Sequence, residues 1–102
     1  MSTYGMSFEE IRDLAVDKYR LPSATANGIA RYLALRIATG DFLRAVLEND
    51  LKNSMGRADE ENRESLFRWV SFLHNEAPSC CWGSPEKVDA WLKWEDENEV
   101  AA

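Results

Sequence analysis

The residues best suited to chemistry lie close together late in the chain: His74, Glu76, Cys80 and Cys81. Thiolate, imidazole and carboxylate groups are the ligands that zinc takes from proteins. A structural zinc site needs four such ligands and a catalytic one needs three, but adjacent cysteines rarely direct both sulfur atoms at one ion. We therefore predict no metal site and no cofactor. One buried cysteine and one partly exposed cysteine is the plainer interpretation.

Cys81 and His74 could also act as a nucleophile and its general base. A third group would have to orient the histidine, and Asp50, Asp59 and Asn75 are the candidates. The sequence has no local catalytic signature around these residues and no glycine-rich phosphate loop. We therefore predict that the protein is not an enzyme. A small enzyme that uses Cys81 and His74 is the least favoured alternative.

Three carboxylates, Asp41, Glu48 and Asp50, could divide the roles of acid and base. Asp41 and Glu48 are seven residues apart, which places them two turns apart on one helix face. A plainer interpretation is favoured, in which Asp41 caps a helix and Glu48 and Asp50 are solvated. Asp41 would cap a helix or lie in its first turn, and Glu48 precedes Lys52 by the spacing that supports an ion pair.

Helices must position these side chains, because apolar residues recur at helical spacing and no segment alternates as a strand would. Start and stop signals divide the chain into about five helices. A capping box of Ser7 and Glu10 opens the first helix, and a serine cap followed by proline, Ser84-Pro85, opens the last. The other predicted starts are Ser23 or Thr25, Asp41 and about Ala58, and the predicted stops are Leu21-Pro22, Gly40, Asn53–Gly56 and His74.

The predicted fold class is therefore all-α: a compact bundle of about five helices in a single domain spanning residues 1–102. Residues 1–6 and 96–102 are expected to be flexible. No apolar run is long enough to cross a membrane, and the first residues do not resemble a signal peptide. Two adjacent cysteines do not make a secreted disulfide framework, so we expect a cytoplasmic protein with reduced thiols and no membrane partner.

The net charge of −6 is unevenly distributed, because basic and acidic residues balance before residue 53 and acids dominate after it. Such a domain repels the phosphate backbone, so general DNA binding is disfavoured, whereas a basic protein would be attracted. A window without acids, residues 18–40, holds Lys18, Arg20, Arg31 and Arg36. Together with Arg44, these arginines could hold a nucleotide or nucleic acid, but Arg31 and Arg36 do not align on one helix face. Scattered solubilising arginines are favoured.

The apolar stripes predict the core. Trp69 and Trp91 lie on such stripes, and Trp82 could staple a turn onto the last helix. Phe67, Phe72 and Trp94 fall off the stripes, so these aromatic residues are candidates for exposed partner anchors. The predicted inner positions are Ile29, Leu33 and Ile37, then Phe42, Leu43, Val46, Leu47 and Leu51, then Leu66, Trp69, Val70 and Leu73, and finally Val88, Trp91 and Leu92.

Three sequence blocks resemble a family of small proteins encoded by phages and prophages: GDFLRAVLENDL (40–51), RADEEN (57–62) and NEAPSCCWGSPEKVDAW (75–91). The first forty residues match that family less clearly. The family is largely uncharacterised, so the resemblance implies a genomic setting rather than a chemistry. Small phage proteins outside the virion often bind and disable host machines, including restriction and CRISPR defence systems. The resemblance thus implies an anti-defence role, similar to that of an anti-CRISPR protein.

Charge, aromatic residues and resemblance together favour a small acidic protein that binds and inhibits or redirects a host protein. In this hypothesis an aromatic residue (Phe67, Phe72 or Trp94) anchors the contact, and four acids steer it towards a basic, nucleic-acid-binding surface such as that of a CRISPR complex. The alternative is a nucleic-acid or nucleotide-binding regulator that uses Arg20, Arg31 and Arg36. A homodimer through a leftover apolar face also stays open. The four acids are Asp59, Glu60, Glu61 and Glu64.

Overall fold

Helices make up the whole framework of this computed structural model, which describes the backbone of residues 5–101 and the side chains of residues 5–93. The all-α prediction is confirmed, with seven α-helices in the described chain rather than about five. The predicted flexible ends, 1–6 and 96–102, fall largely outside the described side chains. The elements are α1 (Phe8–Asp13), the π-helical turn η1 (Leu14–Lys18), α2 (Ser23–Leu35), α3 (Asp41–Leu47), α4 (Leu51–Arg57), α5 (Glu60–Glu64), α6 (Leu66–Glu76), the 3₁₀ turn η2 (Ser79–Cys81) and α7 (Pro85–Ala101).

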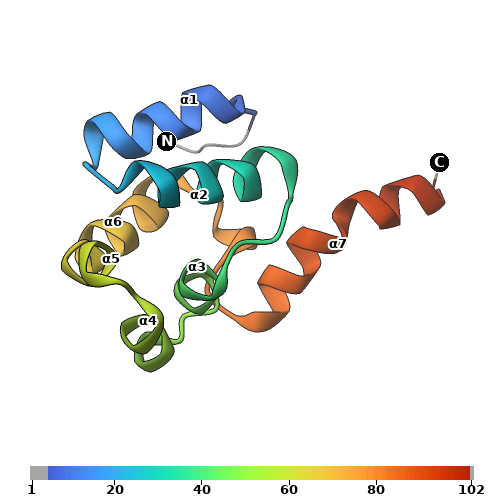
Figure 1. The fold of residues 1–102 in the computed structure, drawn as a ribbon. Coiled ribbons are helices and arrows are strands. Elements are labelled where there is room, and N and C mark those ends of the chain that lie inside the picture. Colours follow the sequence, from blue (N-terminus) through green and yellow to red (C-terminus); the bar gives the residue numbers. More distant parts are fainter. Residues whose placement is uncertain (1–4, 102) are drawn as a thin grey trace.

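The first two helices lie side by side and form one layer of the molecule (Figure 1). Ser7 and Glu10 make the predicted capping box, with the Glu10 amide donating to Ser7 Oγ and the Ser7 amide donating to Glu10 Oε1, each at 3.2 Å. The helix continues into η1 and ends at Arg20, whose φ of 56° reverses the chain before Pro22. The first stop was therefore predicted correctly.

The predicted third helix is interrupted earlier than expected, and the predicted break at Asn53–Gly56 is wrong. Helix α3 ends at Leu47, and Asn49 adopts a φ of 62°, a left-handed conformation that asparagine tolerates better than most residues. Asp50 then caps α4, because its Oδ1 accepts the Asn53 amide at 3.2 Å. A capped start outweighs the poor helix propensity of Asn53–Gly56, which lies inside α4.

The predicted fourth helix is likewise two helices. Asp59 caps α5 by accepting the Asn62 amide at 2.8 Å. Ser65 then takes a φ of −92° and a ψ of 1°, and its hydroxyl donates to the Glu61 carbonyl at 2.7 Å. This back-bonding ends α5 and lets α6 start in a new direction. The acidic residues of α5 are thereby separated from the apolar stripe of α6.

The last helix and the turn η2 before it are each attached to α2 by one buried hydrogen bond. The Trp91 indole N–H donates to the Tyr32 carbonyl at 2.7 Å, and the Tyr32 hydroxyl donates to the Cys81 carbonyl at 2.7 Å. The predicted start of α7 is confirmed, since Ser84 Oγ accepts the Lys87 amide at 3.2 Å. Trp69 and Trp91 are buried, as predicted. No helix in the part of the chain that is described is long and apolar enough to cross a bilayer.

Candidate functional site

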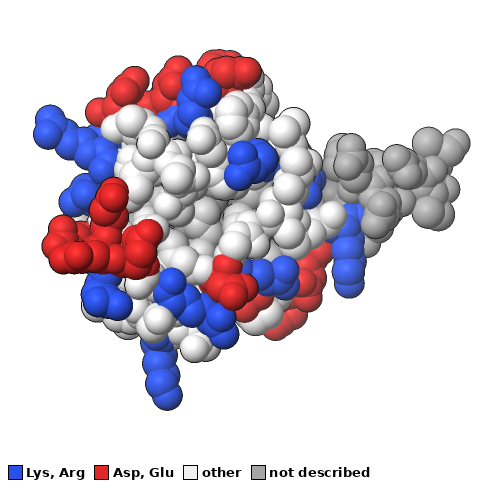
Figure 2. Space-filling view, viewed as in Figure 1, with Lys and Arg blue, Asp and Glu red and all other residues white. Residues whose placement is uncertain are grey.

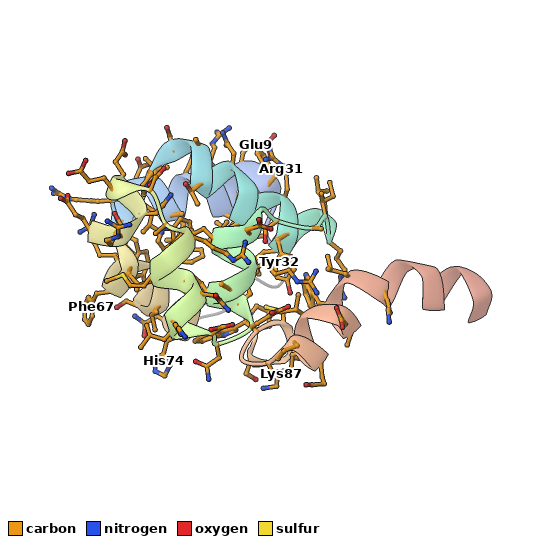
Figure 3. All side chains as sticks on the ribbon, turned by 60° about the horizontal axis from the view of Figure 1, so that its bottom comes forward. Glu9, Arg31, Tyr32, Phe67, His74 and Lys87 are labelled. Atoms are coloured by element: carbon orange, nitrogen blue, oxygen red, sulfur yellow. The ribbon has the colours of Figure 1, made fainter. Side chains whose placement is uncertain are left out.

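The largest departure from an ordinary surface is an apolar face on α4 and α6. Leu51 and Met55, one turn apart on α4, are 70% and 45% exposed. Phe67 and Val70 on α6 are 82% and 41% exposed, and Figure 3 shows Phe67 directed away from the body of the molecule. We call these four side chains the α4–α6 face. Leu51 and Val70 line one groove, and large exposed apolar surface is typical of binding sites.

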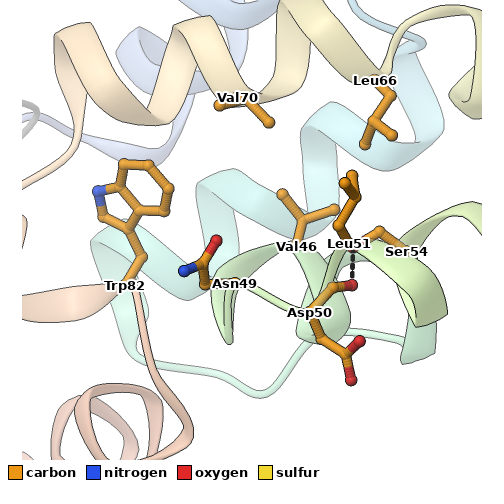
Figure 4. A pocket seen from close by; sticks show the side chains of 8 residues that line it. All are labelled: Val46, Asn49, Asp50, Leu51, Ser54, Leu66, Val70 and Trp82. Carbon is orange, nitrogen blue, oxygen red and sulfur yellow. Dashed lines mark hydrogen bonds between the residues drawn. The ribbon is translucent and has the colours of Figure 1, made fainter.

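A small groove runs along the inner margin of this face (Figure 4). Leu66 and Val70 of α6 face Leu51 and Val46 across it, and Trp82 closes one end. Its volume of about 50 Å³ is far below the several hundred Å³ that a small-molecule site usually offers. A groove of this size suits single apolar side chains from another protein. Its polar members are Asn49, Asp50 and Ser54.

Two corrections to the predicted core explain this face. Leu51 and Val70 were predicted to point inward, but both are exposed. The left-handed residue Asn49 turns the chain, so that Leu51 starts a new helix instead of continuing the buried side of α3. On α6 the inner side is filled by Trp69, Phe72 and Leu73, which leaves Val70 outside. Ile37 was also predicted to be inside, but α2 ends at Leu35 and Ile37 is 45% exposed.

Phe72 is not a partner anchor, because it is fully buried. Its ring meets Tyr19 edge to face, with centroids 5.3 Å apart, and meets Trp69 in the same way at 6.3 Å. Phe67 is thus the exposed member of the pair of phenylalanines. The side chain of Trp94, the third candidate anchor, lies outside the described residues.

The four predicted acids are all exposed and form a patch over α5, seen in red on the left of Figure 2. Asp59 has a local role in addition, since it caps α5. Glu64 is only three residues before Phe67. The acidic patch therefore lies in the chain between the α4 part and the α6 part of the α4–α6 face. Three arginines flank the patch and moderate its negative potential. Arg57 donates to Asp41, Arg63 donates to the Ala58 carbonyl, and Arg68 donates to Ser65 Oγ.

The cysteine and histidine candidates are not brought together as a reactive pair. Cys81 is fully buried, and its Sγ lies 3.1 Å from the Pro78 carbonyl oxygen, to which the thiol donates. Burial raises the pKa of the Cys81 thiol to about 12, so it stays protonated at neutral pH. His74 and Cys80 are exposed. Among the described residues, no three His, Cys, Asp or Glu side chains are grouped so that they could hold a metal.

The candidate arginines occupy three separate environments. Arg20 is the left-handed residue after η1, and its carbonyl accepts from Arg68. Arg36 stacks on the Trp91 ring, with its Cζ 3.4 Å from the ring centroid. Arg31 is exposed on α2 (Figure 3). The three arginines therefore do not build one anion-binding patch.

The predicted roles of the carboxylates are confirmed for Asp41 and corrected for Glu48. Asp41 lies in the first turn of α3, and its carboxylate is paired with Arg57 at 3.1 Å. Glu48 accepts from Arg44 at 2.7 Å rather than from Lys52. Arg44 also bonds to Asp89 at 2.8 Å, which draws its side chain towards α7 and makes it the partner of two acids.

Two buried polar residues matter more than their sequence context indicated. Asn62 accepts from Trp69 Nε1 and donates to Thr25 Oγ1, each at 3.0 Å, and so connects α2, α5 and α6. Glu76 accepts from the Tyr19 hydroxyl at 2.7 Å and from Lys18 at 3.1 Å. Asn62 lies seven residues, or two helical turns, before Trp69. This spacing was the signal in the sequence that could have indicated a hydrogen bond between the two side chains.

The chain matches no protein-family model, no curated protein and no solved structure. The resemblance of its three blocks to phage and prophage proteins therefore stays a prediction.

Proposed function

We propose that the protein acts without catalysis, by binding another protein through the α4–α6 face. The observation that supports this most is the exposure of Leu51, Met55, Phe67 and Val70 on two neighbouring helices. A phenylalanine that is 82% exposed gains little from the fold of its own chain, since burying such a side chain is worth about 2–3 kcal/mol. A partner that covers it supplies that free energy.

The partner in this proposal is a protein with a basic surface. The exposed acids of α5 lie directly before α6, so a partner seated on Phe67 would bring its own charges near Glu60, Glu61 and Glu64. Opposite charges at the rim of an interface raise the rate of association and select the partner. The arginines beside the patch limit this effect, so apolar contact supplies most of the affinity and acidic steering supplies the rate.

A host protein that handles nucleic acid, such as a component of a restriction or CRISPR defence system, is the class of partner that the phage resemblance implies. Such proteins carry basic channels for nucleic acid. Binding of this chain would inhibit or redirect the host protein by occupying such a channel. The dispersal of Arg20, Arg31 and Arg36 gives no support to the alternative in which these three residues bind nucleic acid together.

The test is affinity capture from bacterial host lysate with the wild type, with Phe67→Ser and with a matched control, Leu35→Ser. Leu35 is 52% exposed but lies on α2, outside the α4–α6 face. We expect the same partner from the wild type and the control, and its loss with Phe67→Ser. With purified partner, Phe67→Ser should weaken binding roughly 30-fold, the factor typical of an interface hot spot.

Charge reversal tests the second part of the proposal. The triple variant Glu60→Lys, Glu61→Lys, Glu64→Lys spares Asp59, which caps α5. It should slow association and flatten its dependence on salt, whereas reversal of Glu9, Asp17 and Glu86 should not. Capture of the same proteins by the wild type and by Phe67→Ser would refute the proposal. So would a wild-type homodimer, seen by sedimentation, that Phe67→Ser dissociates.

A further inference from the structure

A second cavity lies away from the α4–α6 face, between α2 and the start of α3. Ala24, Thr25, Gly28 and Arg31 of α2 form one wall. Its volume of about 290 Å³ approaches the size of small-molecule sites, and it opens to solvent. The other wall consists of Gly40, Asp41, Phe42 and Leu43, with Asn62 beside them.

Two glycines line this cavity at positions where the backbone does not require glycine. Neither Gly28 nor Gly40 has a positive φ. Gly28 lies inside α2, where glycine destabilises a helix relative to alanine, and a Cβ there would meet only Leu43 Cδ1, at 3.4 Å. A Cβ on Gly40 would meet nothing within 4 Å. The missing side chains leave space in the cavity, and at Gly28, inside α2, this space comes at the expense of helix stability.

The polar side chains of the lining are those of Thr25, Arg31, Asp41 and Asn62. Thr25 Oγ1 accepts from Asn62 Nδ2 at 3.0 Å, which leaves the Thr25 hydroxyl proton available to donate. Arg31 forms no ion pair with any described residue. The carboxylate of Asp41 is already paired with Arg57 at 3.1 Å. Of the two charged side chains in the lining, Asp41 is therefore paired, and Arg31 is left, among the described residues, with an unpaired positive charge.

We propose that this cavity binds a small organic anion, with its oxyanion held by Arg31 and the Thr25 hydroxyl and its apolar part against Phe42 and Leu43. A carboxylate and a phosphate monoester share this chemistry, and both fit a guanidinium that presents several N–H donors. Arg20 and Arg36 lie outside the cavity, so Arg31 is the arginine that supplies its positive charge. This inference requires no protein partner and is independent of the proposed function.

The test uses isobutyrate and phenyl phosphate as probes and isobutyramide as the neutral counterpart of isobutyrate. Amide chemical shifts of residues 24–31, 40–43 and 62 report binding by NMR. We expect both anions to shift these amides and isobutyramide to leave them unchanged. The tighter of the two anions identifies the headgroup as carboxylate or phosphate.

Two variants and a control complete the experiment. Arg31→Gln should weaken anion binding about ten-fold or more, because it removes a charge-assisted hydrogen bond. Gly28→Ala should weaken binding while the melting temperature stays the same or rises, which separates loss of space from loss of folding. Arg12→Gln removes the same charge outside the cavity, and it should change neither anion binding nor the melting temperature. Equal shifts from isobutyrate and isobutyramide, no shifts from any probe, or equal weakening by Arg31→Gln and Arg12→Gln would each overturn the proposal.

Discussion

The buried indole nitrogen of Trp69 donates a hydrogen bond of 3.0 Å to Oδ1 of Asn62. The same amide donates through its nitrogen to Thr25, so one side chain satisfies polar groups from two other helices. A buried amide with both ends occupied fixes one arrangement of its neighbours. Asn62 thereby sets the position of α5 against α2 and α6, and with it the place of the acidic patch beside the α4–α6 face.

Replacement of Asn62 should therefore be costly. Asn62→Ala leaves the Trp69 indole N–H buried without an acceptor, and the free energy of unfolding should fall by about 2–3 kcal/mol. Urea denaturation followed by tryptophan fluorescence measures this loss. Asn53→Ala is the control, because its side chain bonds to Asp50 at the surface, and it should cost less than about 1 kcal/mol. Equal losses from the two variants would contradict this prediction.

The two phenylalanines of α6 should respond in opposite ways to truncation. Phe72 is fully buried, so Phe72→Ala should lower the free energy of unfolding by about 3–5 kcal/mol. Phe67 is 82% exposed, so Phe67→Ser should change the free energy of unfolding by less than about 0.5 kcal/mol. Chemical denaturation of both variants checks the pair. A large loss from Phe67→Ser would mean that this residue serves the fold rather than a partner.

Stability should fall in acid through Glu76. The hydrogen bond from the Tyr19 hydroxyl, opposed by burial and aided by Lys18, lowers the pKa of the Glu76 carboxyl below its ordinary value of 4.5. A lowered folded-state pKa gives stability that is present above the unfolded pKa and is lost as the pH falls through the folded one. Glu76→Gln should therefore be less stable at neutral pH and should lose less on acidification below about 4.5.

Urea titrations at several pH values between neutral and acid would show this difference in slope, with Glu9→Gln as the exposed control. Tyr19→Phe removes the hydroxyl that contributes most to the lowered pKa of Glu76, so this variant should also lose less stability on acidification than the wild type. Parallel pH profiles for the wild type and Glu76→Gln would rule out this role for Glu76.

The adjacent thiols should differ sharply in reactivity. Cys80 is exposed, whereas Cys81 is buried and burial raises its thiol pKa to about 12. The thiolate is the reactive form, so a disulfide reagent such as DTNB should label Cys80 in the native protein and reach Cys81 only on unfolding. Cys80→Ser should abolish the native reaction. Rapid native labelling of Cys81 in that variant would show that the Cys81 thiol is accessible, contrary to its buried position.

Local signals in the sequence correctly predicted the starts of the first and the last helix, but missed the side-chain caps of α4 and α5. Ser7 with Glu10 and Ser84 before Pro85 both cap helices as expected, because a cap depends only on residues within one turn. The stop at Leu21-Pro22 depends on the same short range.

The sequence was a poor guide where two local signals compete and where tertiary contacts decide. The cap from Asp50 outweighs the break-like composition of residues 53–56, and the bend at Ser65 divides a segment whose apolar periodicity is continuous. Phe72 falls off the predicted stripe, yet it is buried because Tyr19 from another helix covers it. Of the α4–α6 face, the exposure of Phe67 was predicted, whereas that of Leu51 and Val70 was not, because it follows from the turn at Asn49 and from the packing of α6.

The two hydrogen bonds of Tyr32 reach Cys81 and Trp91, which lie 49 and 59 positions further along the chain, so α2 receives these two buried partners only from the last third of the chain. On the ribosome, α2 emerges well before Cys81 and Trp91 exist. The nascent chain must therefore hold its first helices without the carbonyl and indole that complete their core. Folding ends late in synthesis, and a product that stops before Trp91 is left as a substrate for proteases.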